Sequence, residues 1–344
     1  MEFGIALRGR GPLAKPDVLL RMAAKAEALR YDSVFVTDHV VLPASSARST
    51  YPYSPTGQFP GGAQQEYLEP LVLLGWLAHA TRRIRLGTSV LVVPYRNPLL
   101  TAKMLATLDT LARGRLILGV GVGWLAEEFE ALAAPAFAER GAVTDEYVAL
   151  MRAAWTEDPV SFEGRHYRVK DVHVLPKPAQ PHGIPVWIGG HSDAAVKRAG
   201  RLGDGWHPIG GRPPAVLDPD EYAGKVDLLR RAAREAGRRP DRVTLSLRIP
   251  MQVRSPRAKA LAGDRPHFQG TAAEVRGDVE RYAALGVTHF VFDAIEEDLP
   301  GVLTNIARFA EDVRPRVRAS GPDRGRSGAD RSRRRRARGP RPVR

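Results

Sequence analysis

The pattern of apolar and polar positions along the chain predicts strands and helices that alternate almost throughout. Short apolar runs rich in Val, Ile, Leu and Phe are typical of buried strands, whereas apolar residues spaced three and four apart are typical of helices. The predicted strands cover residues 3–7, 34–37, 84–92, 115–121, 185–190, 203–209, 243–253 and 287–293. The predicted helices cover 17–30, 69–81, 98–112, 124–133, 141–156, 192–202, 219–237, 271–285 and 299–314, and a small hairpin is expected over 160–169, turning at Glu163 and Gly164.

This order of elements predicts an α/β fold, a (β/α)8 TIM barrel with loop insertions. Eight strands that alternate with helices are typical of this barrel. Residues 116–118 and 290–292 are apolar on both strand faces, as a parallel sheet covered by helices requires. A doubly wound sheet is the alternative, but the loop after the first strand, RGRGPLAKP, lacks the GxGxxG pattern. In such a barrel, catalytic residues follow the strands at the carboxyl-terminal face.

The positive charge of the chain is concentrated at one end. The net charge is +14, and residues 314–344 hold 13 Arg and two Asp, which account for +11 of it. This Arg-rich segment has almost nothing apolar to bury, so we expect a barrel domain over 1–315 and a disordered tail over 316–344. Such a tail could contact nucleic acid through phosphates. The rest of the chain is close to neutral, so we expect a solvated extension without that role.

Several classes of function lose support from composition. The chain has no Cys, which excludes disulfides, thiolate metal sites and cysteine nucleophiles. The nine His show no metal-ligand spacing, and no GxSxG, HExxH or Walker A pattern occurs, so no metal is predicted. The start of the chain lacks the apolar core of a signal peptide, and no apolar run approaches the roughly 20 residues that cross a bilayer. We expect a cytoplasmic protein without membrane contact.

A carboxylate and an imidazole stand side by side where the second predicted strand ends. The segment is SVFVTDHVVLP, residues 33–43, with Asp38 and His39 directly after the apolar run. An imidazole has an ordinary pKa near 6.5, so it can donate or accept a proton around neutrality. We predict that His39 is catalytic and that Asp38 orients it or hydrogen-bonds a cofactor. The alternative is a strand-end histidine that is held by a neighbouring carbonyl.

Small residues at the ends of three further strands indicate a cofactor site. Residues 87–89 interrupt the third strand, and glycines alternate over 119–123, leaving one strand face bare so that a flat ring could lie there. After the fifth strand, Gly189 and Gly190 lead into a helix that Ser192 caps. The N–H groups at a helix N-terminus favour an anion, usually a phosphate. Together these features predict a planar cofactor that carries a phosphate.

Six segments together resemble the luciferase-like monooxygenase superfamily: VTDHVVLP, IRLGTSVLVVPYRNP, RLILGVGVGWLAEEFEALA, WTEDPVSFEGRHY, PVWIGGHSDAAVKRAGRLGDGW and GVTHFVFD. The resemblance spans roughly residues 1–315 and favours the branch that uses the deazaflavin coenzyme F420. It implies a bacterial-luciferase-like barrel, hydride transfer between F420 and a small organic substrate, and a homodimer. In that branch, Asp38 and His39 match residues that approach the deazaflavin.

The resemblance also implies which other residues contact the cofactor. The Ser89–Val90 bond matches a cis peptide behind the ring, while Val92, Val122 and Gly123 match positions that line it, and Gly189 and Gly190 match the turn that holds the phosphate end. Two positions depart from the sugar-phosphate dehydrogenases of the family, because Trp124 replaces a Glu and Glu127 replaces an Asn. Oxidation of a sugar phosphate is therefore not expected, and the substrate stays open.

Two other functions remain alternatives at this point. An FMN-dependent monooxygenase, supplied with reduced flavin by a separate reductase, would use the same barrel. A non-enzymatic protein could bind flavin without turnover or act through the basic tail.

Overall fold

The predicted barrel is confirmed. The computed structural model describes residues 1–258, 261 and 265–317. The barrel strands within these residues are β1 (Glu2–Ala6), β2 (Ser33–Val36), β3 (Arg85–Thr88), β5 (Leu116–Gly121), β8 (Val186–Gly189), β9 (Gly205–His207), β10 (Thr244–Val253) and β12 (His289–Ala294). Each strand pairs in parallel with the next, and β12 pairs with β1, so the described sheet closes on itself.

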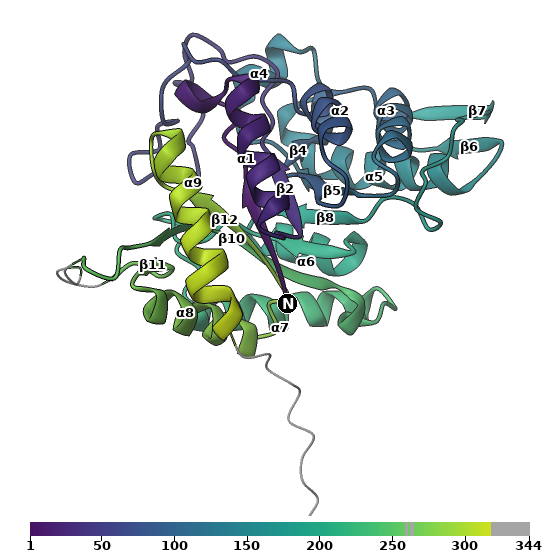
Figure 1. Ribbon diagram of the computed structural model, residues 1–344. Helices are drawn as coiled ribbons and strands as arrows, with labels where there is room; N and C mark the ends of the chain where they lie inside the picture. Colours follow the sequence, from purple (N-terminus) through teal and green to yellow (C-terminus); the bar gives the residue numbers. More distant parts are fainter. Residues whose placement is uncertain (259–260, 262–264, 318–344) are drawn as a thin grey trace, which may run out of the picture.

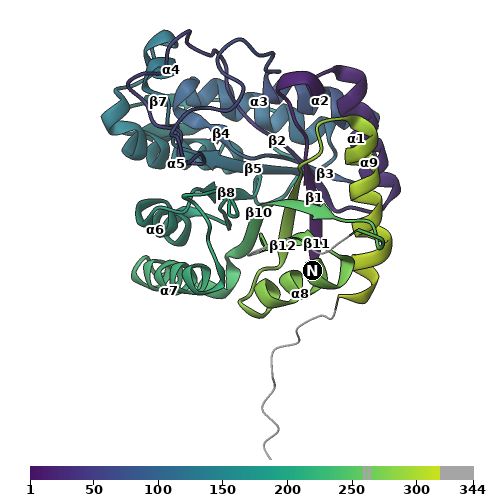
Figure 2. The same ribbon diagram turned by 90° about the vertical axis from the view of Figure 1, so that its left-hand side faces the viewer.

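The helices surround the barrel, as Figures 1 and 2 show. They are α1 (Pro16–Ala28), α2 (Pro70–Ala80), α3 (Pro98–Leu111), α4 (Ala126–Ala131), α5 (Arg140–Thr156), α6 (Asp193–Leu202), α7 (Pro219–Glu235), α8 (Ala272–Ala284) and α9 (Leu299–Arg308). Short 3-10 segments cover Gly11–Leu13, Val93–Tyr95, Phe137–Glu139, Pro240–Arg242 and Arg314–Arg316. Polar residues next to the helices cap their N-termini: Asn97 caps α3, and Thr271 forms a capping box with Glu274 at α8.

The third predicted strand is not continuous. β3 ends at Thr88, and the strand resumes as β4 (Leu91–Val92), which pairs with β5. The Ser89–Val90 peptide bond between them is cis, as the resemblance implies. The last predicted helix is also divided, because α9 ends at Arg308 and continues as a π-helical turn over Phe309–Val313. A short strand β11 (Gln269–Gly270) lies beside β10.

The predicted hairpin is present and slightly longer than expected. β6 (Val160–Glu163) and β7 (Arg168–Val172) pair antiparallel, and the turn closes where the Gly164 N–H donates to the Tyr167 carbonyl at 2.9 Å. The hairpin projects from the barrel beside α5 (Figure 1).

Side chains inside the barrel change character from its centre to its mouth. An apolar cluster that includes Phe35 and Trp187 fills the middle, and the ring of His207 stacks on Phe35 at 5.1 Å. Because side chains alternate along a strand, Arg248 of β10 and Asp293 of β12 also face the interior, closer to the carboxyl ends. The barrel mouth is therefore charged above an apolar floor.

The carboxyl-terminal end of the described chain returns to the amino-terminal helix. The Arg314 guanidinium donates to the carbonyls of Leu29 and Arg30 at 2.7 and 2.8 Å. Residues 318–344, which hold most of the predicted tail, lie outside the described residues. Among the described helices, none is long and apolar enough to cross a membrane.

Candidate active site

His39 is held in one orientation by a buried carboxylate. Its Nδ1 lies 2.6 Å from Oε2 of Glu128, a residue with no solvent exposure. The same carboxylate accepts hydrogen bonds from the N–H groups of Val40 and Val41, at 2.7 and 3.2 Å, and from the Tyr95 hydroxyl at 2.9 Å. Burial and the charge of Glu128 raise the pKa of Tyr95, so this hydroxyl keeps its proton and donates.

This arrangement fixes the tautomer of the imidazole. A carboxylate can only accept, so Nδ1 of His39 carries hydrogen and Nε2 is the free nitrogen of the neutral ring. Nε2 makes no hydrogen bond within the described residues. The ring is enclosed by aromatic side chains, with centroids 5.0 Å from Phe59, 5.1 Å from Tyr67 and 6.0 Å from Trp124. Nε2 is therefore the atom that can take or give a proton.

Asp38 has partners of its own and does not orient His39. Both oxygens accept from the Arg96 guanidinium, at 2.7 and 2.9 Å, and Oδ2 also accepts from the Val92 N–H at 2.8 Å. Burial works against the charge on Arg96, but its bonds to Asp38 and Glu69 raise its pKa above the ordinary value. The expectation that Asp38 orients His39 is thus wrong. The Asp38 carboxylate instead fixes the backbone directly after the break between β3 and β4.

The glycines near this break accommodate one valine. A Cβ on Gly121 would lie 2.3 Å from Val90 Cγ2, and one on Gly189 would lie 2.6 Å from Val90 Cγ1. A Cβ on Gly119 would lie 1.9 Å from the Thr88 carbonyl oxygen. The interpretation of the alternating glycines as a bare strand face is therefore wrong, because Val90 and Thr88 fill that space. Val90 itself is only partly buried and forms part of the accessible surface at the strand ends.

Of the other residues expected to line a ring, two are accessible and one is not. Val122 and Gly123 are partly buried, and Gly123 has a φ of +85°, which favours glycine. The Val92 side chain is buried in a small cluster with Tyr95 and Phe129. It supports the surface from behind.

The turn after β8 offers donors to an anion. Gly190 has a φ of +92°, and its carbonyl accepts from the Trp206 indole at 2.8 Å. Ser192 is exposed and caps α6, its hydroxyl accepting from the Ala195 N–H at 3.3 Å. Between them, Nδ1 of His191 is buried and has no hydrogen-bond partner among the described residues, and burial lowers the pKa of this imidazole. A nitrogen of this kind beside the first turn of a helix is suited to a phosphate.

A buried ion pair supports the cis peptide from inside the barrel. Nη1 of Arg248 donates to the carbonyl and hydroxyl oxygens of Ser89, at 2.8 and 3.1 Å. Its other nitrogens bond the Asp293 carboxylate, which also accepts from Arg212 at 3.0 Å. Although burial opposes ionisation, the charges of Arg248 and Arg212 hold the pKa of Asp293 well below its usual range. The carboxylate therefore stays charged and keeps Arg248 in place.

The loop between β2 and α2 brings aromatic rings over the barrel mouth. Burial raises the pKa of Tyr53 to about 12, which keeps its hydroxyl protonated, and Tyr67 donates to the Thr37 hydroxyl beside His39. Tyr51 contacts the rings of Tyr53, Phe59 and Trp124, the tryptophan that follows β5. Phe59 also contacts Trp124, and Tyr67 contacts His39. These rings enclose the site above His39.

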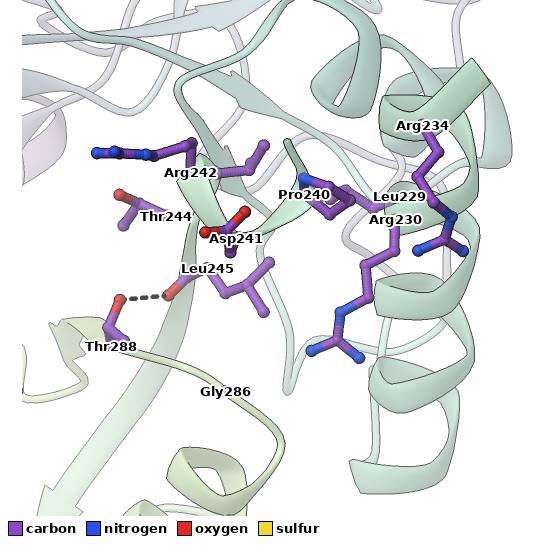
Figure 3. Close-up of a pocket in the computed structure, with 11 residues that line it drawn as sticks. Leu229, Arg230, Arg234, Pro240, Asp241, Arg242, Thr244, Leu245, Gly286 and Thr288 are labelled. Carbon is purple, nitrogen blue, oxygen red and sulfur yellow. Dashed lines mark hydrogen bonds between the residues drawn. The ribbon is translucent and has the colours of Figure 1, made fainter. Parts of the chain in front are cut away.

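A hollow of about 500 Å³ lies at the amino-terminal end of the barrel, away from His39. Arg230 and Arg234 of α7 form one wall and Arg242 lies on the other, with Thr244 at the amino end of β10 (Figure 3). Catalysis in this fold occurs at the carboxyl-terminal face, so we assign the site to the face with His39. No group of His, Asp and Glu in the described residues is arranged to hold a metal.

Sequence reasoning located the strand-end residues but missed their buried partners. Glu128 carries a signal that could have found it: it follows the buried Leu125 by three positions and precedes Leu132, which packs on a buried cluster, by four, so it shares a helix face with both. Arg248 stands in an apolar strand, where a charge needs a partner, two positions after Ser246 on the same face. Neither position indicates which residue is its partner.

Comparison with known proteins now places this geometry in a family. The model of the family described as luciferase-like monooxygenase matches residues 1–326. The chain belongs to this family. Together with the closed barrel, this match confirms the resemblance seen in the sequence.

Named relatives and solved structures agree with this membership. The chain is 37% identical over 217 residues to an uncharacterised protein of Mycobacterium tuberculosis, covering 63% of this chain and 72% of that protein. It is 31% identical to an F420-dependent glucose-6-phosphate dehydrogenase of Kineococcus radiotolerans, covering 88% of this chain and 94% of that one. A structure of an F420-dependent secondary alcohol dehydrogenase with an F420–acetone adduct has the same fold, with a TM-score of 0.73, 21% identity, and 92% and 99% of the two chains covered.

Proposed function

We propose that this luciferase-like family member is an F420-dependent oxidoreductase that transfers a hydride between the deazaflavin and a small organic substrate. The observation that carries the proposal is the His39–Glu128 pair, which presents an oriented imidazole beside the accessible strand ends. Relatives about 30% identical over most of the chain are F420-dependent by name, which supports the choice of cofactor.

The residues present fit such a cofactor. The unpaired Nδ1 of His191 and the exposed start of α6 suit its phosphate, with Gly189, Gly190 and Ser192 at the turn. The surface formed by Val90, Val122 and Gly123 suits its ring. When bound, a deazaflavin supplies hydride transfer at carbon and reacts poorly with oxygen.

The side chains of the protein then have to transfer one proton to or from the substrate. Nε2 of His39 accepts the proton of an alcohol substrate during oxidation or donates one to a carbonyl oxygen during reduction. Glu128 keeps the ring in the required tautomer and stabilises the imidazolium that forms. The surrounding aromatic rings exclude water from this exchange.

We also propose a homodimer, which the resemblance implies and an apolar surface supports. The exposed side chains of Val72 and Trp76 lie on α2, and those of Leu100, Met104 and Leu111 lie on α3. The two helices are neighbours on the outside of the barrel (Figure 1). An exposed apolar surface of this kind is typical of an interface between protein chains.

Equilibrium binding of F420 and FMN to the purified full chain tests the proposal. Tryptophan fluorescence reports the site, because Trp124 adjoins His39 and Trp206 holds the Gly190 carbonyl. We expect F420 to bind at least about tenfold more tightly than FMN, a difference of about 1.4 kcal/mol. The reverse order would favour the FMN-dependent monooxygenase; monooxygenase is the reaction class that the family's description names.

The role of His39 is tested separately from cofactor binding. A panel of alcohols, aldehydes, ketones and enones, assayed with oxidised or reduced F420, provides the best substrate for the comparison. His39→Ala is expected to lower turnover by about 10²-fold or more while F420 affinity is retained, since positioned proton transfer contributes about that much. Turnover within about threefold of the wild-type value would remove the catalytic assignment.

A further inference from the structure

A pocket of about 480 Å³ lies beside the proposed site, between the loop after β2 and the start of α4. Phe59 from the loop and Trp124, which follows β5, line it, with ring centroids 5.6 Å apart. The same two rings contact the imidazole of His39. Phe59 and Trp124 are therefore shared between the lining of this pocket and the surroundings of the His39 imidazole.

The loop after β2 forms the wall of the pocket, and hydrogen bonds hold it at both ends of this wall. At its start, the Glu127 carboxylate accepts from the Arg48 N–H at 2.8 Å and from the Ser49 hydroxyl at 2.6 Å. At its end, the Arg10 guanidinium donates to the Pro60 carbonyl at 2.7 Å. Glu127 thus holds the loop, which explains why a carboxylate stands at this position.

The pocket lining carries no ionisable side chain. Its polar groups are neutral hydroxyls and an amide, contributed by Ser45, Ser46, Ser49, Thr50, Thr56 and Gln58. The adjacent Arg48 points its guanidinium to Glu130, bonding both carboxylate oxygens at 2.8 and 2.7 Å. A phosphate or carboxylate in the pocket would lose water without gaining a cation, which is costly. An uncharged ring would gain apolar contact and could use the hydroxyls.

We propose that this pocket binds the uncharged, ring-bearing part of the substrate and discriminates against phosphorylated or carboxylated compounds. The inference rests on the proposed function, since it takes His39 as the reacting centre. It assigns the substrate class as a neutral aromatic or alicyclic compound with an alcohol or carbonyl group. The Phe59 and Trp124 rings provide the stacking surfaces.

A matched pair of probes tests this assignment by calorimetric titration of the full chain. The probes are 2-naphthol, which is neutral, and 2-naphthyl phosphate, which has the same ring and a charged group. We expect 2-naphthol to bind at least about tenfold more tightly, because the phosphate is desolvated without a partner. Equal or tighter binding of the phosphate overturns the proposal.

A charge placed in the lining shows whether the probes occupy this pocket. Thr50→Lys adds an ammonium, so the preference for 2-naphthol is expected to shrink by about tenfold or reverse. Thr304→Lys, on the exposed face of α9, is the control and is expected to keep the wild-type ratio. An unchanged ratio in Thr50→Lys overturns the proposal.

F420 affinity measured on the same preparations separates the two hypotheses. Tight F420 binding without 2-naphthol binding removes only the substrate class. Binding of 2-naphthol without F420 removes the proposed function and leaves a neutral-ring pocket.

Discussion

Asp38 and His39 are adjacent in the chain, yet each is held by a different buried network. Asp38 meets Arg96, and His39 meets Glu128. Neighbouring side chains on an extended backbone point in opposite directions, so two adjacent residues can serve two sides of a strand end. One of them fixes the backbone near the cis peptide, and the other presents Nε2 to the site.

Loss of the Glu128 charge is expected to disturb catalysis more than binding. Glu128→Gln keeps the shape of the side chain but removes the full charge that holds Nδ1 of His39. We expect kcat/KM to fall by at least about tenfold, part of what positioned proton transfer contributes, with F420 affinity within about twofold. Glu130→Gln, on the exposed face of the same helix, is the matched control. Parallel losses in affinity and turnover would indicate a structural role alone.

The buried His207 predicts a pH-dependent stability. Burial, and then the nearby charge of Arg248, lower its pKa from 6.5 to about 3. Between these two pH values, the His207 imidazole binds a proton in the unfolded chain but stays neutral in the folded one. The free energy of unfolding therefore falls as the pH drops from about 6.5 toward 3, by up to about 1.4 kcal/mol per pH unit.

Denaturant unfolding of His207→Asn across this pH range measures that contribution. The variant is expected to show a shallower pH dependence than the wild type, whereas His182→Asn, at an exposed position, should keep the wild-type slope. Identical slopes in all three proteins would contradict the prediction.

At the scale of elements, the break between β3 and β4 depends on contacts with β5. The Gly119 site shows this most directly, because a Cβ there would lie 1.9 Å from the Thr88 carbonyl oxygen. Gly119→Ala is expected to lower the free energy of unfolding by about 2–4 kcal/mol, since backbone must shift. Gly224→Ala, in α7 with open space around it, should instead stabilise by about 0.5–1 kcal/mol. A neutral Gly119→Ala would show that the break tolerates displacement.

The sequence indicated most elements because their patterns are local. Strands such as β10 and β12 are apolar runs, and α8 begins with its own capping box. The small residues 87–89 interrupt the apolar run of the third strand, but they do not show that the strand ends there and resumes at Leu91. Only the resemblance pointed to the cis peptide at Ser89 and Val90. The partners of His39 were equally hidden, because Glu128 is 89 positions away and its neighbour Glu127 has the same chemistry.

At the scale of the whole molecule, the apolar surface of α2 and α3 predicts the assembly state. Leu100 and Leu111 are 59% and 65% exposed, which leaves large apolar side chains in water unless a second copy covers them. Leu100→Glu and Leu111→Glu are each expected to shift the protein toward monomer in size-exclusion chromatography with light scattering. Val216→Glu, at an exposed loop position elsewhere, should leave the dimer intact. A wild-type protein that is monomeric at micromolar concentration would contradict this.

The first barrel strand has the last one as a neighbour. β1 pairs with β12 from Glu2 opposite His289 to Ile5 opposite Phe292. On the ribosome, one edge of β1 therefore stays unpaired until the chain has been synthesised beyond Ala294. At roughly 5–20 residues per second, that interval lasts roughly 15–60 s. Throughout it the nascent chain displays an open strand edge to chaperones and to neighbouring chains, and the barrel can close only after β12 has been synthesised.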